Sequence, residues 1–198
     1  MGTRAEQLLE TRRRIIEAAA EAFSELGFHA ASTREIAARA GTNQGLITYH
    51  FRSKDELWRA AADRIFAGLR DELRLESAVG GDERERAREA VRQYVRFVAA
   101  HPELFRLMVE EGKSADDRMQ WLVDTHLRPL YVGFERLLGQ HVPGAGGEMI
   151  ASAYYALAGA ASLMFAVGPE CQRLTGRDPA RRPAIEAHAE FVARLFVP

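Results

Sequence analysis

Apolar residues recur every three or four positions along most of this 198-residue chain, and no segment alternates between apolar and polar residues as a β-strand does. The first helical pattern runs from about Thr11 to Leu26 and stops at Gly27. Its apolar members are Ile15, Ile16, Ala19, Ala20, Phe23 and Leu26. The periodicity continues toward the C-terminus, so the sequence predicts an all-α fold of about nine helices.

The next segment predicts two short helices joined by a tight turn. Ser32 and Glu35 have the spacing of a capping box that opens the first helix, and Gly41 can adopt the left-handed conformation that ends it. Asn43 is a good N-cap for the second helix, which is predicted to run to about His50. This is the layout of a helix-turn-helix, whose second helix enters the DNA major groove.

The two faces of these helices differ in polarity. Ile36, Ala37 and Ala40 form an inner stripe on the first helix, and Ile47 and Phe51 can reach the core from the second. The opposite arc of the second helix is available to DNA. Its expected groove-facing residues are Asn43, Gln44, Gly45, Thr48 and Tyr49.

The side chains on that arc suit base readout. Gln44 can pair with the edge of an adenine, and Thr48 can donate its hydroxyl or offer its methyl group to a thymine. A second group is expected to contact phosphates and set the register on the duplex. Its members are Thr33, Arg34, His50 and Lys54.

The sequence of this module resembles the tetracycline-repressor (TetR) family of transcriptional regulators. The strong similarity covers about a quarter of the chain, in residues 15–23, 26–28 and 32–57. Gly41 to Phe51 is similar to the family's recognition helix, and Ser53 to Leu57 to the start of its next helix. Thr48 departs from the pattern, because many members carry an aromatic residue there, so base readout at that point is expected to differ.

The resemblance implies an N-terminal three-helix head and a C-terminal helical bundle that binds a small effector and dimerises. We therefore expect a helix-turn-helix DNA-binding domain in residues 1–52 and a ligand-binding and dimerisation domain in residues 53–198. In the family, an effector in the body changes the spacing of two heads through the fourth helix. Here that helix is predicted to begin near Lys54, behind a capping box of Ser53 and Glu56, and to end at about Leu75.

Later helix boundaries follow from caps and breaks. Residues 78–82 are a predicted break, and a Pro/Gly loop is predicted at residues 141–147. Ser114 with Asp117 is expected to start a long helix to about Gln140, kinked at Pro129. Asp178 and Pro179 are expected as N-cap and first residue of the last helix. A glycine-proline break is predicted before Cys171, a quiet, partly buried thiol.

Aromatic and polar side chains at helical spacing in the body have two interpretations. The spacing alone favours plain core, whereas the family resemblance favours a pocket between helices, lined mainly by apolar groups. Arg106 and Arg118 could meet an acidic effector, but a solvated charge is the favoured interpretation for each. The candidate lining residues are Phe97, Phe105, Met108, Trp121, His126, Tyr131, Phe134, Tyr154 and Met164.

The last two predicted helices have the pattern of a dimer interface. Small residues between Ala151 and Ala161 permit close helix approach, and a large apolar stripe would be costly to leave exposed. An internal pair of core helices is the alternative interpretation. The expected interface residues are Ala151, Tyr155, Ala158, Ser162, Phe191 and Leu195.

Composition narrows the class of protein. The chain is 47% hydrophobic and 28% charged with a net charge of −1, which by itself does not indicate nucleic-acid binding. No apolar run is judged to reach the roughly 20 residues needed to span a bilayer, and no signal-peptide core is seen, so a cytoplasmic protein is expected. The histidines form no chelating pair, so no metal site is expected. No phosphate-binding glycine loop is present, and neither a cofactor nor an enzyme activity is expected.

The sequence thus favours a dimeric, ligand-responsive transcriptional repressor that binds an inverted-repeat operator. The main alternative is a small-molecule binding protein whose head has lost DNA binding, against which the intact caps and polar groove face argue. An enzyme built on this body lacks a catalytic constellation.

Overall fold

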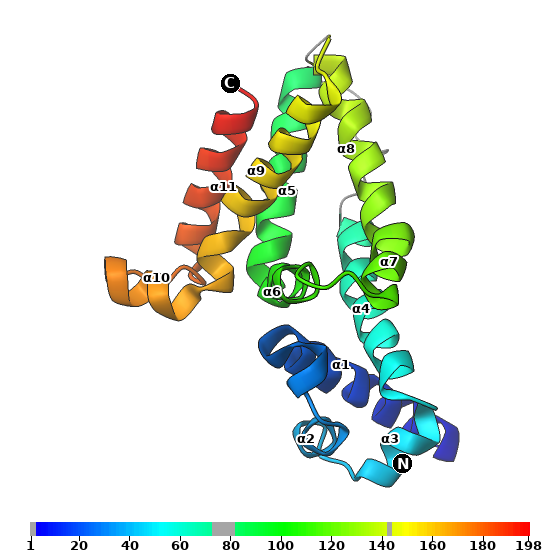
Figure 1. Ribbon diagram of the computed structural model, residues 1–198. Coiled ribbons are helices and arrows are strands. Elements are labelled where there is room, and N and C mark those ends of the chain that lie inside the picture. Colours follow the sequence, from blue (N-terminus) through cyan, green and yellow to red (C-terminus); the bar gives the residue numbers. More distant parts are fainter. Residues whose placement is uncertain (1–2, 73–81, 142–143) are drawn as a thin grey trace.

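The computed structural model describes residues 3–72, 82–141 and 144–198. Helices make up most of this part of the chain, and no strand occurs within it, which confirms the predicted all-α fold. Figure 1 shows a small head of α1, α2 and α3 at one end and a taller helical body above it. α4 rises from the head along one side of the body and connects the two.

The head begins earlier than the sequence predicted. α1 spans Arg4–Ala30, because Thr3 and Glu6 form a complete capping box at its start. At Gly27 the backbone turns to φ 75°, so the expected stop is present, but another helical turn follows it. α2 spans Thr33–Arg39 and α3 spans Gln44–His50, as expected.

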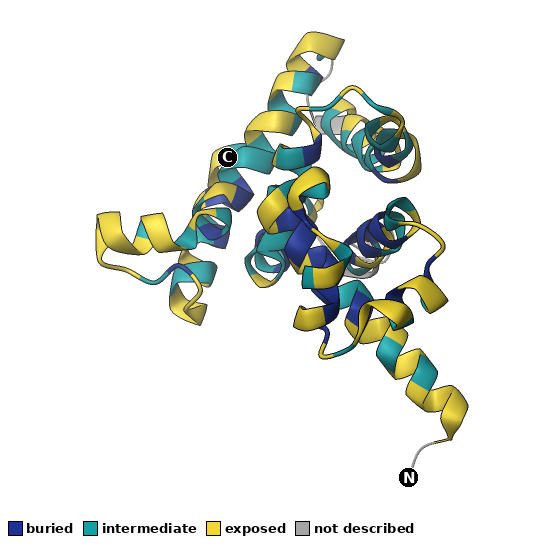
Figure 2. Cartoon of the chain, turned by 60° about the horizontal axis from the view of Figure 1, so that its bottom comes forward, coloured by how far each residue is buried: buried dark blue, intermediate teal, exposed yellow. Residues whose placement is uncertain are grey.

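The core of the head is formed by the predicted stripes. Ile15, Phe23 and Ile36 are completely buried, and Ile47 and Phe51 are 3% and 2% exposed. Gly41 adopts φ 60° in the turn between α2 and α3, a conformation that glycine reaches without steric cost. Buried residues lie on the inner sides of the helices, and the outer sides are exposed (Figure 2).

The first body helices agree with the predicted pattern where the structure describes them. α4 spans Lys54–Glu72, α5 spans Glu83–Ala100 and α6 spans Pro102–Glu111. The predicted end of α4 at Leu75 and most of the predicted break at residues 78–82 lie outside the described residues.

The predicted long helix after residue 114 starts two residues late and is not uniform. Asp116, not Ser114, is the N-cap: its carboxylate accepts the N–H of Met119 at 3.1 Å. α7 spans Asp117–Leu122, a π-helical turn η1 spans Val123–Leu127, and α8 spans Arg128–His141. The expected distortion near Pro129 therefore takes the form of a widened turn just before it.

The C-terminal part differs from the prediction in two places. α9 spans Gly147–Ala166 and is followed by a helix that the sequence pattern did not indicate, α10, which spans Gly168–Thr175 and includes Cys171. The last helix, α11, spans Arg182–Phe196 and not a range beginning at Pro179. Asp178 instead accepts the N–H of Ala180 in a tight turn, because this short loop has to reverse the chain. Within the predicted loop at 141–147, residues 142–143 lie outside the described residues.

Two arginines of α5 attach α11 to the body. Arg92 Nε lies 2.9 Å from a carboxylate oxygen of Glu190, and Arg96 Nη2 lies 2.8 Å from Glu186. Next to these ion pairs, Ala189 and Val192 of α11 are completely buried. α5 therefore occupies one side of α11 and α9 also contacts this helix, whereas Phe191 and Leu195 remain 62% and 58% exposed.

α9 corrects the expectation that no segment could span a membrane. It is a 20-residue helix with a mean hydropathy of 1.5, long and apolar enough by length and composition alone. In the structure it packs against α5, α6, α8 and α11. The core helix of a soluble protein can pass the same test, so a single helix of this kind is weak evidence for a membrane span.

Phe23→Ala should lower the free energy of unfolding by about 3–5 kcal/mol, because a completely buried ring is removed from the head core. Leu9→Ala on the same helix is the matched control. Leu9 is 69% exposed, so its loss should change the stability by less than about 0.5 kcal/mol. Urea denaturation measures both, and equal effects of the two variants would contradict this packing of α1.

Candidate nucleic-acid interface

The polar arc of α3 lies on the surface, as the sequence predicted. Asn43 caps the helix by accepting the N–H of Leu46 at 3.0 Å, and Ile47 anchors the opposite side in the core. Tyr49 is 69% exposed. The other exposed members of the arc are Asn43, Gln44, Gly45 and Thr48. The helix thus presents polar side chains outward on a rigid support, as a groove-reading helix requires.

Two side chains on this arc have fixed partners within the head. The amide of Gln44 donates from Nε2 to the hydroxyl of Thr33 at 3.0 Å. The hydroxyl of Thr48 donates to the backbone carbonyl of Gln44 at 3.3 Å. In this arrangement Thr48 turns its proton inward, so its methyl group and oxygen lone pairs remain for a base edge.

Exposed arginines flank the recognition helix. Arg34 lies in the first turn of α2, and Arg52 lies two residues after the end of α3. Neither makes an ion pair with any described residue, whereas Arg39 is paired with Glu25 at 2.7 Å and with Glu35. Arg34 therefore keeps its predicted availability for phosphate, and Arg52 is a candidate that the sequence pattern did not indicate.

His50 and Lys54 are less available to phosphates than the sequence suggested. His50 Nε2 is buried, and burial, aided by the nearby Arg12, lowers the pKa of the ring, so it is neutral at pH 7. Lys54 Nζ lies 4.6 Å from the ring centroid of Phe28 and donates to the carbonyl of His29. Both contacts turn Lys54 toward the end of α1.

Lys54 belongs to a cluster that joins the head to the body, which we call the joint. Its other members are Phe28 of α1, Trp58 of α4, Glu111 of α6 and Arg118 of α7. The Arg118 guanidinium lies 3.7 Å from the centroid of the Phe28 ring and 6.0 Å from that of Trp58. Elements distant in sequence meet here, so the joint fixes the orientation of the head on the body.

Two charged groups in the joint are shielded from solvent. Glu111 is 3% exposed, and its Oε2 lies 3.6 Å from Arg118 Nε. Burial raises the pKa of Glu111, while Arg118 and the N–H of Phe28 oppose that rise. Arg118 also pairs with Asp116, and Arg106 donates to the carbonyl of Ala166 at 2.8 Å. The interpretation of Arg106 and Arg118 as solvated charges was therefore wrong.

The predicted ligand residues do not form one group. Trp121 and His126 pack against α4, with ring centroids 5.3 Å apart. Tyr131 and Phe134 of α8 contact Tyr154 of α9 edge to face, at 5.3 and 5.5 Å. Phe97 is buried, and Phe105, Met108 and Met164 are partly buried on α6 and α9. The rings contact one another, which suits the core interpretation at least as well as a pocket.

His126 is the most buried polar member of that set, at 2% exposure. Its ring stacks on Phe66 at 4.6 Å, and Nδ1 lies 3.0 Å from Arg70 Nη1. Because arginine can only donate, Nδ1 is the acceptor and Nε2 carries the proton, 3.0 Å from Asp63 Oδ1. Burial lowers the pKa of this histidine, which favours the neutral ring. It connects the π-turn to α4.

The predicted interface residues mostly lie on an outer face. Tyr155, Phe191 and Leu195 are 72%, 62% and 58% exposed. Ala151 and Ala158 are partly exposed on α9. Ser162 is the exception: it is 1% exposed and faces Tyr94 of α5, because that turn of α9 packs inward, so it was wrongly assigned to an outer surface.

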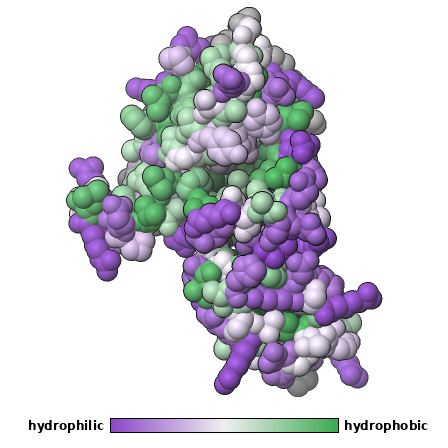
Figure 3. Space-filling view, viewed as in Figure 1, coloured by the Kyte–Doolittle hydropathy of each residue, from purple (hydrophilic) through white to green (hydrophobic). Residues whose placement is uncertain are grey.

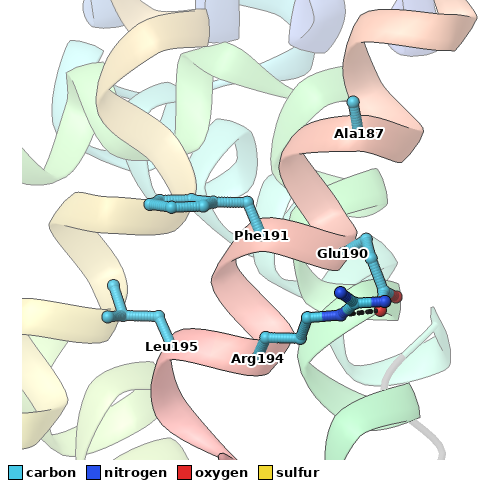
Figure 4. Close-up of a pocket in the computed structure, with 5 residues that line it drawn as sticks. All are labelled: Ala187, Glu190, Phe191, Arg194 and Leu195. Atoms are coloured by element: carbon cyan, nitrogen blue, oxygen red, sulfur yellow. Dashed lines mark hydrogen bonds and ion pairs between the residues drawn. The ribbon is translucent and has the colours of Figure 1, made fainter.

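A shallow hollow lies on α11 within this face. Figure 4 shows Phe191 and Leu195 pointing to one side of the helix. On the other side, Arg194 donates to Glu190 at 2.6 Å. No predicted ligand residue lines this hollow. Hydrophobic residues gather over this upper part of the molecule, whereas polar residues predominate over the head (Figure 3).

Comparison with known proteins agrees with the geometry of the head. Residues 15–61 match the model of bacterial regulatory proteins of the tetR family, a range that holds most of α1, all of α2 and α3, and the start of α4. This part of the chain is therefore a DNA-binding head of the tetR-family type.

Two helix-turn-helix regulators each match about half of this chain. The HTH-type transcriptional regulator BetI of Escherichia coli O45:K1 is 36% identical over 115 residues, which cover 48% of this chain and 59% of BetI. The HTH-type transcriptional activator FasR of Mycolicibacterium smegmatis is 36% identical over 105 residues, which cover 51% of this chain and 46% of FasR. The chain thus matches only about half the length of these regulators.

A solved regulator shares the fold of nearly the whole chain. AibR, solved in complex with isovaleryl coenzyme A and operator DNA, superposes with a TM-score of 0.73 at 16% identity. The superposition covers 95% of this chain and 98% of AibR. At this identity the likeness establishes the fold of the body but not its ligand.

Glu111→Gln should remove a pH dependence of stability that originates in the joint. Because burial raises the pKa of Glu111 above its usual 4.5, the folded state holds this proton more tightly than the unfolded state. The free energy of unfolding therefore falls as the pH rises from about 4.5 through the raised pKa, by at most about 1.4 kcal/mol per pH unit.

Urea denaturation between pH 4 and pH 7 measures this effect. The stability of the wild type relative to Glu111→Gln should fall as the pH rises, and comparing the two cancels the contributions of other groups. A difference that stays constant over this range would show that Glu111 titrates normally.

Proposed function

We propose that this chain is a ligand-responsive transcriptional regulator that binds operator DNA as a homodimer. The observation that carries the proposal is the exposed polar arc of α3, held outward by its Asn43 cap and its Ile47 anchor. An arc of amide, hydroxyl and phenol groups on a rigid helix suits base edges in the major groove. Bacterial cytoplasm, where the chromosome lies, is the corresponding compartment.

The expected contacts follow from the geometry of the head. Gln44, Gly45, Thr48 and Tyr49 face the groove, and Asn43 lies at the start of the helix. Arg34 and Arg52 contact phosphates on either side, with Thr33 beside them. His50 and Lys54 have a smaller part in DNA contact than in supporting the head, because both are engaged within the protein.

Dimerisation is proposed through the outer face of α9 and α11. An isolated chain would expose Tyr155, Phe191 and Leu195 together with Leu163, which is 54% exposed. A second copy that covers this face would bring two heads onto one duplex. Two-fold symmetry of the protein then requires an inverted repeat in the operator.

An effector is proposed to bind in the body and to release the protein from its operator, as in a repressor. The complex of AibR with an acyl coenzyme A and DNA supports a body that can serve a ligand. In this chain the aromatic cluster of Tyr131, Phe134 and Tyr154 is the nearest equivalent to an apolar lining. A binding protein whose head no longer contacts DNA remains the second candidate, and selection of DNA by the purified protein separates the two.

Operator affinity should fall steeply with salt, with a log–log slope of about −0.9 per contacted phosphate. The operator is first isolated by selecting fragments from random DNA with the purified protein. Arg34→Ala should flatten the slope by about one unit per head, because one phosphate contact is lost. Fluorescence anisotropy at several salt concentrations provides the measurement.

Two controls make this test specific. Arg128→Ala removes an exposed cation of the body and should leave the slope unchanged. Lys54→Ala should also leave it nearly unchanged, since Lys54 is held against Phe28. A flatter slope for Lys54→Ala with an unchanged slope for Arg34→Ala would reverse our assignment of the phosphate contacts.

Phe191→Glu should convert the dimer into folded monomers at micromolar concentration. Its side chain is 62% exposed in the single chain but would be buried without a partner charge in the dimer, at a cost of several kcal/mol. Sedimentation measures the mass, and operator binding should be lost because one head makes half the contacts. Val109→Glu on α6, at 45% exposure, is the matched control and should remain dimeric. A dimeric Phe191→Glu would place the interface elsewhere.

A further inference from the structure

One side-chain contact joins the first residues of α2 and α3. Gln44 donates from Nε2 to the hydroxyl oxygen of Thr33 at 3.0 Å. Thr33 is half-buried and Gln44 is exposed. Each residue directly follows an N-cap, so the contact connects the N-terminal ends of the two helices of the helix-turn-helix.

Thr33 and Gln44 can bond to each other because the side chains of the two N-cap residues already bond to other groups. The Ser32 hydroxyl accepts the N–H of Glu35 at 3.1 Å, and Asn43 accepts that of Leu46. Neither cap competes for the Gln44 amide. Thr48 donates to the Gln44 carbonyl, so the backbone of Gln44 is also held. The flexible side chain of Gln44 is thereby held at its terminal amide, and its backbone carbonyl is held by Thr48.

The hydrogen bond leaves on Gln44 the groups that an adenine requires. A primary amide has two N–H groups and one oxygen, and Thr33 takes one N–H. The second N–H and Oε1 together match the acceptor and donor of an adenine edge. The Thr33 hydroxyl accepts the bond from Gln44 and so keeps its own proton, which it can donate to a phosphate oxygen.

We propose that Thr33 is a specificity-determining positioning residue: its hydroxyl holds the Gln44 amide in the orientation that reads an adenine, while its own proton binds the adjacent phosphate. The proposal rests on the DNA-binding function proposed above. It assigns to Thr33 a role in sequence preference beyond phosphate contact. The DNA phosphate contact made by α2 is thus linked to the base contact made by α3.

The test compares four variants with the wild type: Thr33→Val, Thr33→Ser, Gln44→Ala and the double variant Thr33→Val/Gln44→Ala. Valine has nearly the shape of threonine but no hydroxyl, and serine keeps the hydroxyl. Affinity is measured by fluorescence anisotropy for the selected operator and for the same operator with each other base pair at every position in turn. Base preference is the ratio of these affinities. Thermal melting checks that each variant is folded.

Thr33→Val should reduce the preference at the position read by Gln44 by about 2- to 12-fold, the effect of having to fix one flexible side chain on binding. Thr33→Ser should keep the preference. In the Gln44→Ala background, where that preference is already lost, Thr33→Val should change it no further. The double variant should bind more weakly than Gln44→Ala by the same factor for all base pairs, as expected when a phosphate contact is lost.

Three results would overturn the inference. An unchanged preference in Thr33→Val, with weaker binding to every sequence alike, would leave Thr33 a phosphate contact only. Loss of preference in Thr33→Ser equal to that in Thr33→Val would show that the hydroxyl is not responsible. A wild type that selects no DNA would overturn the proposed function and this inference with it, whereas the first two results leave DNA binding intact.

Discussion

Contact between the end of α1 and the body is the constraint on which the rest of the molecule depends. A dimeric helix-turn-helix protein that reads two half-sites needs each recognition helix held in a fixed orientation on its body. Here the Arg118 guanidinium, placed over the Phe28 ring and next to Glu111, holds the head on the body of the same chain. Removing one charge of such a shielded pair would leave the other uncompensated, so both must be present together.

Local signals in the sequence were sufficient to predict α2, α3 and the turn between them. Ser32, Gly41 and Asn43 act on their immediate neighbours, through a hydrogen bond three residues away or a φ angle that glycine tolerates. Their effect does not depend on the rest of the chain. For the same reason the outward face of α3 could be assigned from helical spacing alone, and its residues do lie on the surface.

Features that depend on tertiary contacts could not be predicted in this way. Charges on Lys54 and Arg118 suggest solvent or an anion when seen in isolation, and only the fold brings both to Phe28. Ser162 carries the same small-residue signal as its neighbours on α9, but its turn faces α5. α10 was missed because none of its residues is buried, so it carries no inward apolar stripe to detect.

The π-turn η1 acts as a phase shift within one helix. In a regular α-helix, residues five apart are separated by about 140° around the axis, so Trp121 and His126 would face different neighbours. The hydrogen bond from the N–H of Arg128 to the carbonyl of Val123 closes a wider turn, and the two rings meet 5.3 Å apart against α4. After that turn the regular α-helical period resumes in α8, with its side chains rotated about the helix axis relative to those of α7. Tyr131 and Phe134 of α8 then contact Tyr154 of α9. One continuous helix thereby faces two partners, and the number of residues in that turn sets the angle between them.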